Sequence, residues 1–382
     1  MSDVARGPGL RIAWMEEWMS TLAREVLPDL SRRHEITYVT SGDEVPRGDL
    51  ARVIHGRRWR HMNVAGFELS RRVDRLYADG AIDLAMVWAS IGFALRRSPF
   101  INLEGTSVYA QIGLFASREP VRRRARFLPG LLHYAVPEML CNRRALRIIV
   151  PSEALKRDIV RLHGVPDERV AVVPHGVEPG HLKCYERKRP AARTTLLFVG
   201  RLHYGKGIAD VLEEFARRPD IEADFVVAGD GPDRHRVERV AAADPRIRMT
   251  GALGRGELEA LLSTTQVFVL PTFYEGFGLS LLEAMASGHA CACYDVPAVR
   301  EVLGDAGVLV PSGDPRALVD AVAALVRDEG RVASLARHAH RRAARFSWSD
   351  AVDAIDRVIR ECAPARPLPE KGPVALRETP TP

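Results

Sequence analysis

The order of the predicted elements constrains this chain more than any other feature. Short runs rich in Val, Ile and Leu alternate with longer amphipathic stretches, the first at residues 16–32, and the alternation occurs twice. Such an order is typical of βαβ units, and therefore of parallel sheets covered by helices. The predicted strands of the first series are residues 11–15, 35–40, 83–89, 99–103, 147–151 and 169–174, and those of the second are residues 195–199, 224–228, 246–250, 266–270, 290–294 and 307–310.

The length of the chain points to two domains. A chain of 382 residues is too long for one compact core, since single cores stop growing at roughly 250–300 residues. We therefore predict an α/β protein in which two Rossmann-like domains face each other across a cleft. The predicted divisions are an N-terminal domain at 1–180, a polar linker at 181–194, a C-terminal domain at 195–345, a helix at 346–362 that returns to the N-terminal domain, and a disordered tail at 363–382.

The charge and the cysteines narrow the class of protein. A net charge of +6 is too small to indicate a nucleic-acid-binding protein. Nearly all basic residues are arginines, so lysine, which occurs only at positions 156, 183, 188, 206 and 371, is the more informative residue. Five cysteines without a Cys-x-x-Cys pair or a His cluster predict reduced thiols in a cytoplasmic protein and no metal site. No run reaches the roughly 18 apolar residues of a membrane span.

Two cations surround a glycine-rich turn that follows the predicted strand at 195–199. The sequence there is Gly200-Arg201-Leu-His-Tyr-Gly-Lys206-Gly. Glycine lets a backbone approach a ligand closely, and two cations beside the start of a helix suit a diphosphate. The turn is not a Walker A loop, because no Ser or Thr follows Lys206 to hold magnesium. The protein itself is therefore expected to neutralise the phosphate charge.

Two carboxylates follow the predicted strand at 266–270. The segment runs Glu275-Gly-Phe-Gly and then enters an apolar helix that contains Glu283. A helix that opens on small residues presents free N–H groups and the positive end of its dipole, which favours a phosphate at 277–279. Carboxylates beside that phosphate can accept hydrogen bonds from sugar hydroxyls. The segment therefore predicts a site for a phosphorylated sugar.

Several motifs occur along the chain, at Val150-Pro-Ser152, Val172-Val-Pro-His-Gly-Val177, Phe198-Val-Gly-Arg201-Leu-x-x-x-Lys206-Gly, Val227-Ala-Gly-Asp-Gly-Pro232 and Glu275-x7-Glu283. Together they resemble the GT-B glycosyltransferases of family 4. The resemblance is close across 147–310 and coarse across 11–99. It implies a retaining transfer of sugar from a nucleotide diphosphate, with no metal ion and no other cofactor.

The resemblance also implies roles for individual residues. Arg201 and Lys206 would bind the donor diphosphate, Glu275 the transferred sugar and Glu283 the ribose, while the base would lie near residues 250–253. The further donor-binding residues that it implies are Gly200, Thr250, Leu253, Gly276, Phe277, Gly278 and Leu279.

Two departures from the family pattern concern the acceptor. Relatives carry a glycine pair after the first strand, whereas this chain has Glu16, Glu17 and Trp18. Relatives place a histidine after the strand that corresponds to 99–103, where this chain has Glu104, which we add to the catalytic candidates Glu275, Arg201 and Lys206. Carboxylates here could attract a cationic acceptor such as an aminosugar or an aminocyclitol, or they could be solvated loop residues. His175 is the remaining acceptor-side candidate.

The leading hypothesis is a cytoplasmic hexosyltransferase that uses a UDP-sugar and a small-molecule acceptor, as in antibiotic biosynthesis. A first alternative is a peripheral membrane enzyme that glycosylates a lipid or cell-envelope precursor through a basic surface at 118–147. Others are a GT-B sugar phosphorylase, a nucleotide-sugar epimerase and a non-catalytic nucleotide-sugar binding protein. The expected partners are the nucleotide-sugar and the acceptor, without nucleic acid, and the sequence leaves the oligomeric state open.

Overall fold

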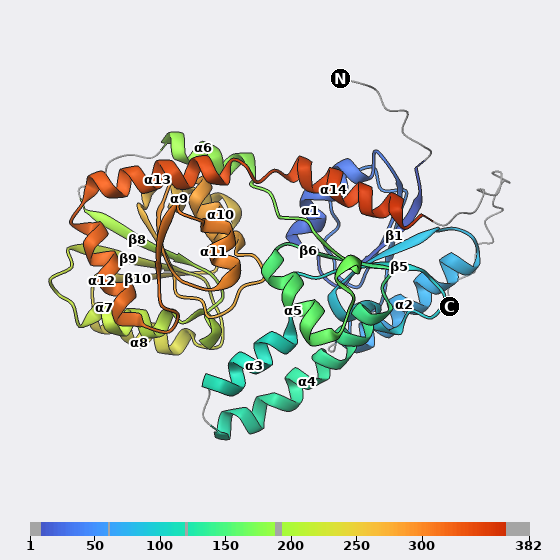
Figure 1. Ribbon diagram of the computed structural model, residues 1–382, viewed down its shortest axis with the longest axis horizontal. Coiled ribbons are helices and arrows are strands. Elements are labelled where there is room, and N and C mark those ends of the chain that lie inside the picture. The colour runs from blue at the N-terminus through green and yellow to red at the C-terminus, as the bar shows by residue number, and fades with distance from the viewer. Residues whose placement is uncertain (1–8, 60–61, 119–120, 188–192, 364–382) are drawn as a thin grey trace.

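The protein consists of two α/β lobes, each built on a parallel sheet (Figure 1). The computed structural model describes residues 9–59, 62–118, 121–187 and 193–363, apart from the side chains of residues 62, 115–118, 121–131 and 185–187. The predicted tail at 363–382 lies almost wholly outside these residues. The predicted class, an α/β protein with two Rossmann-like domains, is confirmed.

The first lobe contains a seven-stranded parallel sheet in the order β3-β2-β1-β4-β5-β6-β7. Its strands are β1 (Arg11–Glu16), β2 (Glu35–Thr40), β3 (Arg52–His55), β4 (Leu84–Trp88), β5 (Phe100–Leu103), β6 (Arg147–Val150) and β7 (Val170–Val172). Its α-helices are α1 (Thr21–Leu30), α2 (Met62–Ala78), α3 (Val108–Arg118), α4 (Val121–Arg144) and α5 (Glu153–His163), and its 3-10 helices are η1 (Ala89–Ala94) and η2 (Asp167–Arg169).

The second lobe contains a six-stranded parallel sheet in the order β10-β9-β8-β11-β12-β13. Its strands are β8 (Thr194–Val199), β9 (Ala223–Ala228), β10 (Ile247–Gly251), β11 (Val267–Leu270), β12 (Ala290–Tyr294) and β13 (Gly307–Val310). Its helices are α6 (Pro179–Arg187), η3 (Tyr204–Lys206), α7 (Ile208–Ala216), α8 (Arg234–Ala243), α9 (Arg255–Thr264), α10 (Leu279–Ala286), α11 (Pro297–Leu303), α12 (Pro315–Val326) and α13 (Glu329–Ala343), and α14 (Trp348–Glu361) follows.

The strand order reverses once in each sheet, and these two places locate the site. In the first sheet the chain leaves β1 toward β2 on one side and later returns to place β4 on the other. In the second sheet β8 has β9 on one side and β11 on the other. The loops at the carboxyl ends of such neighbouring strands diverge and leave a crevice, where ligands bind in open α/β sheets.

Two segments cross between the lobes side by side. The N–H of Val177 donates to the carbonyl of Phe346 at 3.0 Å. A Cβ on Gly176 would lie 2.1 Å from the backbone nitrogen of Trp348, so only glycine allows this close approach. The following helix α14 buries Ile355 and Ile359 in the core of the first lobe. The described part of the chain therefore ends on the lobe in which it begins (Figure 1).

Two of the predicted boundaries differ from the structure, and one strand was not predicted. The segment predicted as a linker begins inside α6, which belongs to the second lobe because Cys184 is buried in that core. The helix predicted at 16–32 begins only at residue 21, because β1 continues through Glu16 and Ser20 caps the helix by accepting from the N–H of Ala23. The strand β3 was missed, since this edge strand lacks a buried face.

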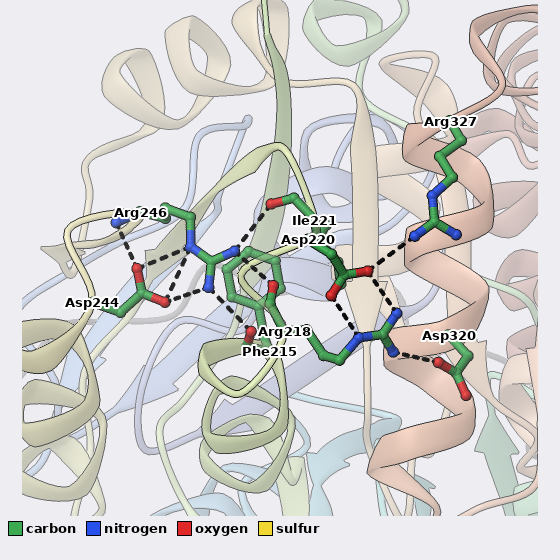
Figure 2. Close-up of polar contacts among 8 residues, drawn as sticks. All are labelled: Phe215, Arg218, Asp220, Ile221, Asp244, Arg246, Asp320 and Arg327. Atoms are coloured by element: carbon green, nitrogen blue, oxygen red, sulfur yellow. Dashed lines mark hydrogen bonds and ion pairs between the residues drawn. The ribbon is translucent and has the colours of Figure 1, made fainter.

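Arg246 holds the end of α7 against the sheet (Figure 2). Its guanidinium donates to the carboxylate of Asp244 and to the carbonyl oxygens of Phe215, Arg218 and Ile221. It also lies 4.5 Å from the centre of the Phe215 ring. The Phe215 carbonyl belongs to α7, and those of Arg218 and Ile221 belong to the loop that follows it. Arg246, the residue before β10, therefore joins the end of α7 and this loop to that strand.

We expect Arg246→Met to destabilise the second lobe by about 2 to 3 kcal/mol, since the buried carboxylate of Asp244 and three carbonyls lose a charged donor. The melting temperature should fall by several degrees, measured by circular dichroism. The matched control is Arg248→Met, which changes an exposed arginine two residues further along, within β10. Equal melting temperatures of the two variants would contradict the assignment.

Candidate functional site

One cavity of about 310 Å³ lies at the carboxyl ends of β8 and β11. We call it the Lys206 cavity. It is lined by residues of both lobes, namely Gly105, Thr106, Gln111, Leu114, His175, His203, Tyr204, Gly205, Lys206, Tyr274, Glu275, Gly276, Phe277, Gly278, Leu279 and Ser280. The cavity therefore occupies the crevice that the strand order of the second sheet predicts.

Lys206 and Glu275 form an ion pair in this cavity. Their loops follow β8 and β11, which are hydrogen-bonded neighbours, so two residues far apart in the sequence meet. Both side chains are largely buried, at 19% and 13% exposure. Thr272 fastens the second loop, because its hydroxyl donates to the carbonyl of Tyr274 at 2.9 Å. The pair combines a fixed cation with a fixed acceptor of hydrogen bonds.

The start of α10 supplies the second feature of the cavity. Gly278 precedes the helix with φ of +102°, a conformation that side chains disfavour. Gly278, Leu279 and Ser280 line the cavity. The first N–H groups of a helix have no partner inside it, and its dipole places partial positive charge there. This end of α10 can therefore hold an anion beside Lys206.

The loop that carries Glu275 also touches the first lobe. A Cβ on Gly276 would lie 1.9 Å from the carbonyl oxygen of Gly105, so the two backbones are in direct contact. The hydroxyl of Ser152 donates to the carbonyl of Gly276 at 2.6 Å, and the N–H of Ser107 donates to the hydroxyl of Tyr274 at 3.3 Å. The first lobe thus fixes the position of this loop.

The other predicted donor residues do not line the Lys206 cavity. The predicted group outside it consists of Gly200, Arg201, Thr250, Leu253 and Glu283. Gly200 packs against the backbone of Gly229. A Cβ on Gly229 would lie 1.9 Å from the carbonyl oxygen of Gly200, so only glycine fits there. Arg201 is exposed on the same loop. Their donor-binding roles stay predictions.

Glu283 lies on α10 among other carboxylates at the junction of the lobes. Burial, and then the charge of Glu178, raise the pKa of Glu283 to about 7. Arg255 acts in the opposite direction and pairs with Glu178. Glu283 is therefore poised to accept or give up a proton near neutral pH.

A second cavity of about 600 Å³ lies at the carboxyl ends of β1, β4 and β5, and we call it the Glu104 cavity. Of the predicted acceptor-side residues, Glu17, Trp18, Glu104 and His175 line it. Glu104 does not reach the Lys206 cavity, whereas His175 lines both. The two cavities also share Gly105, Thr106, Gln111 and Leu279, so they lie next to one another.

His175 lies at the junction of the two cavities. Its ring stacks on Trp348, with centroids 5.5 Å apart, and tilts against Phe277 at 5.1 Å. Burial lowers the pKa of His175 to about 4, so the ring is neutral at pH 7. Its buried Nδ1 has no hydrogen-bond partner among the described residues. The ring therefore serves packing on two sides and retains a free polar atom.

Glu16 does not line either cavity, which corrects its prediction as an acceptor-side residue. Its side chain turns into the core because the hydroxyl of Tyr38 donates to Oε1 at 2.7 Å and the N–H of Ser20 donates to Oε2 at 3.2 Å. Burial raises the pKa of Glu16 to about 7. Glu16 thus joins β1, β2 and the start of α1 rather than contacting a ligand.

The raised pKa of Glu16 predicts a pH dependence of stability. Between pH 4.5 and 7 the folded protein holds a proton on Glu16 that the unfolded chain releases, so this contribution is complete below pH 4.5 and is lost as the pH rises through 7. The unfolding free energy of the wild type should fall between pH 5 and 8. In Glu16→Gln we expect this fall to be smaller by on the order of 2 kcal/mol. Urea titrations measure it, and exposed Glu35→Gln should keep the wild-type slope.

Several lining residues were not predicted from the sequence. His203, Tyr204 and Tyr274 line the Lys206 cavity, and Glu138 lines the Glu104 cavity. His203 and Tyr204 lie inside the loop already singled out, so their position was the available signal. Glu138 lies within α4, where a single carboxylate in a helix carries no signal of its own.

The basic surface predicted at 118–147 is only partly described. The side chains of Arg118–Arg126 lie outside the described residues. Nearby, Arg143 donates to the carbonyl of His163 at 2.7 Å and Arg144 donates to the carbonyl of Phe93 at 2.9 Å. Among the described helices, none has both the length and the hydropathy that crossing a membrane requires.

Known proteins resemble this chain in sequence or in structure. The D-inositol 3-phosphate glycosyltransferase of Thermobispora bispora is 32% identical over 238 residues, 56% of each chain. The 2-deoxystreptamine N-acetyl-D-glucosaminyltransferase of Streptomyces fradiae is 32% identical over 237 residues, 56% of this chain and 55% of that one. This chain thus matches little more than half the length of these relatives. The structure of HepE from Anabaena with UDP and glucose has a TM-score of 0.70 at 16% identity, covering 92% of this chain and 99% of that one, which shows a common fold.

Family models match both lobes in the order that the fold requires. The model described as Glycosyltransferase Family 4 matches residues 19–181, which include most of the first sheet. The model described as Glycosyl transferases group 1 matches residues 193–328, which include the whole second sheet. Two parallel sheets with a cavity at the carboxyl ends of β8 and β11 complete the agreement. The chain belongs to the GT-B glycosyltransferases of family 4.

Proposed function

We propose that the protein is a retaining glycosyltransferase that moves a hexose-type sugar from a nucleotide diphosphate sugar to a hydroxyl of a small-molecule acceptor. The observation that carries this proposal is the ion pair of Lys206 and Glu275 beside the start of α10. A cation and free helix N–H groups suit the diphosphate, and a carboxylate suits the sugar hydroxyls. UDP is the nucleotide that we propose, and the HepE structure with UDP and glucose supports this choice.

The chemistry follows from the charge that the reaction creates. The bond between the anomeric carbon and the phosphate oxygen breaks, and the acceptor oxygen bonds to that carbon from the same face. The departing phosphate oxygen takes the proton of the acceptor hydroxyl. Lys206 and the N–H groups of Gly278 and Leu279 would stabilise the negative charge that develops on the leaving group. Glu275 would orient the sugar, and a diphosphate would compete with Glu275 for Lys206.

The acceptor would bind in the Glu104 cavity, which lies next to the Lys206 cavity. An aminosugar or an aminocyclitol, as in antibiotic biosynthesis, is the acceptor that we propose. The relative from Streptomyces fradiae carries an aminocyclitol, 2-deoxystreptamine, in its name. The carboxylates of the cavity support the same choice.

Product analysis tests the proposal. The full-length protein is incubated with UDP-sugars and aminocyclitols, the product is detected by mass spectrometry, and its anomeric configuration is read by NMR. We expect a glycosylated acceptor with the anomeric configuration of the donor. An inverted product would contradict the retaining mechanism. Dependence on inorganic phosphate would indicate a phosphorylase, conversion of the donor alone an epimerase, and nucleotide binding without turnover a binding protein.

A specific observation favours one second candidate, a peripheral membrane enzyme. Leu132, Val136 and Leu140 are exposed on α4 at intervals of four residues, so they form one apolar stripe. Such a stripe suits the surface of a bilayer. Sedimentation with vesicles of phosphatidylcholine and phosphatidylglycerol tests it, since a membrane enzyme would sediment with the vesicles and a Leu132→Ser, Val136→Ser, Leu140→Ser variant would not.

A further inference from the structure

Three carboxyl groups line the Glu104 cavity, and none of its described lining residues is a lysine or an arginine. The acidic residues are Glu17, Glu104 and Glu138. They come from the loop after β1, from the end of β5 and from α4, so the fold gathers them from three separate elements. His175 also lines the cavity, and its ring is neutral at pH 7 because burial lowers its pKa. The described part of the cavity wall therefore gives the acidic groups no positively charged neighbour.

Neutral donors hold two of these carboxyl groups in place. Oε1 of Glu104 accepts from the side-chain amides of Asn102 at 2.9 Å and Asn142 at 3.0 Å. Both carboxylate oxygens of Glu138 accept from the N–H of Val108, at 3.1 and 3.0 Å. Amide N–H groups orient a carboxyl group without cancelling its charge. Burial raises the pKa of Glu138 to about 8, and burial and then the charge of Glu138 raise the pKa of Glu104 well above its usual range. The cavity therefore holds these two carboxyl groups largely protonated at pH 7, and an ammonium group that enters would favour their charged form.

Glu17 provides an independent sign of an incomplete site. Its side chain is 94% buried and lines the cavity, and Oε2 has no hydrogen-bond partner among the described residues. A buried polar atom without a partner is destabilising, so folded proteins rarely keep one without a purpose. The backbone shows a second irregularity in this wall, because Ala89 is the one described residue other than glycine with a positive φ, of 52°. Such strain gathers at binding sites.

The rest of the wall is apolar. Leu22, Trp88 and Ile91 form much of it, and Tyr134 and the exposed Trp18 contribute aromatic surface. Apolar walls favour the carbon face of a ring, and acidic groups among them favour positive charge. A phosphate group would meet three carboxyl groups and no described cation. The cavity thus selects by charge as well as by shape.

We propose that the Glu104 cavity is a subsite for a cyclic amine, whose ammonium group lies against Glu104 and Glu138, and that the same carboxyl groups exclude phosphorylated acceptors. This inference rests on the proposed function and deepens it by naming the groups that choose the acceptor. Glu104 and Glu138 act by binding and hold no part in the bond-breaking step. The T. bispora relative is named for an inositol phosphate, a class of acceptor that this subsite would exclude.

Binding measurements test the subsite without turnover. Isothermal titration of the full-length protein, saturated with UDP, compares 2-deoxystreptamine with myo-inositol, which carries hydroxyls only, and with myo-inositol 1-phosphate. We expect the amine to bind about 10- to 100-fold more tightly than inositol, because a hydrogen bond between charged groups adds that much affinity. The phosphate should bind more weakly than either. Equal affinity for the amine and for inositol, or tighter binding of the phosphate, would overturn the inference.

Amide variants identify the groups responsible. Glu138→Gln and Glu104→Gln should each remove most of the preference for the amine while the affinity for UDP stays unchanged. The matched control, Glu35→Gln, changes an exposed carboxylate of the same lobe and should keep the preference. If either buried variant fails to fold, Glu17→Gln replaces it and should lower the affinity for the amine in the same direction. A preference that survives all three variants refutes the subsite. Failure of UDP itself to bind would refute the proposed function instead.

Discussion

Lys206→Met is expected to abolish the stabilisation of the protein by UDP and to slow sugar transfer by about 100- to 1000-fold. Lys206 is the cation that lines the cavity at the carboxyl ends of β8 and β11, where the start of α10 also points. Methionine keeps much of the length of the side chain and removes its charge. The leaving diphosphate would then lose the charged donor that stabilises it most in the transition state.

Differential scanning fluorimetry with UDP and turnover with a UDP-sugar measure the effect, each relative to the variant's own baseline, because the ion pair with Glu275 is also lost. The matched control is Lys156→Met, which removes a lysine paired with Asp167 at 2.8 Å on the first lobe. It should respond to UDP as the wild type does. A Lys206→Met variant with a normal UDP response would show that the diphosphate binds elsewhere.

Gly276→Ala should reduce turnover by on the order of 100-fold while the protein stays folded. A Cβ at this position would lie 1.9 Å from the carbonyl oxygen of Gly105, a backbone atom that cannot turn aside. The lobes must then separate, and the loop loses the hydrogen bond from Ser152 to the Gly276 carbonyl. Glu275 would move with the loop, so the reacting groups would no longer be aligned.

Steady-state kinetics measures this effect, and Gly256→Ala provides the matched control. A Cβ on Gly256 in α9 meets no atom within 4 Å, so that variant should be neutral or slightly more stable. Small-angle scattering should show a more open pair of lobes for Gly276→Ala than for either the wild type or the control. Unchanged turnover in Gly276→Ala would show that contact between the lobes at this loop is not needed for transfer.

The fold was predictable because its signals are local. Runs such as 290–294 are buried on both faces, and β12 (Ala290–Tyr294) has the predicted bounds. The edge strand β3 was not predictable, since its residues are largely exposed and carry no alternation. The helix α6 was missed because its sequence is polar, and only contact with the second lobe buries Cys184. Tertiary contacts decide such elements.

The candidate site, like the fold, was predictable only in part. Lys206 and Glu275 were predictable, because each follows a strand in a glycine-containing loop and parallel strands bring such loops together. Contacts between the lobes were not, since nothing in the sequence links Gly105 to Gly276 or Ser152 to the Gly276 carbonyl. The hydroxyl of Ser152 also caps α5, because it accepts from the N–H of Leu155. One side chain thus holds the helix and the loop of the other lobe.

The acceptor side shows where sequence position misleads. Glu16 is the last residue of β1 and Glu17 is the first residue after it, and the two side chains reach different surroundings. Glu16 turns to Tyr38 in the core, while Glu17 lines the Glu104 cavity. Glu138 comes to the same cavity from a helix distant in sequence, so only the packing of α4 reveals it. The predicted carboxylate cluster therefore exists with one member replaced.

A melting-temperature screen with UDP, GDP, ADP and dTDP and with their sugars tests most directly the claim that the Lys206 cavity binds a nucleotide-sugar. A ligand present at about 100 times its dissociation constant adds about 2.7 kcal/mol of stability. We predict that UDP and a UDP-sugar raise the melting temperature of the wild type and of Lys156→Met, and leave that of Lys206→Met unchanged. The absence of a response of the wild type to every diphosphate would contradict the account.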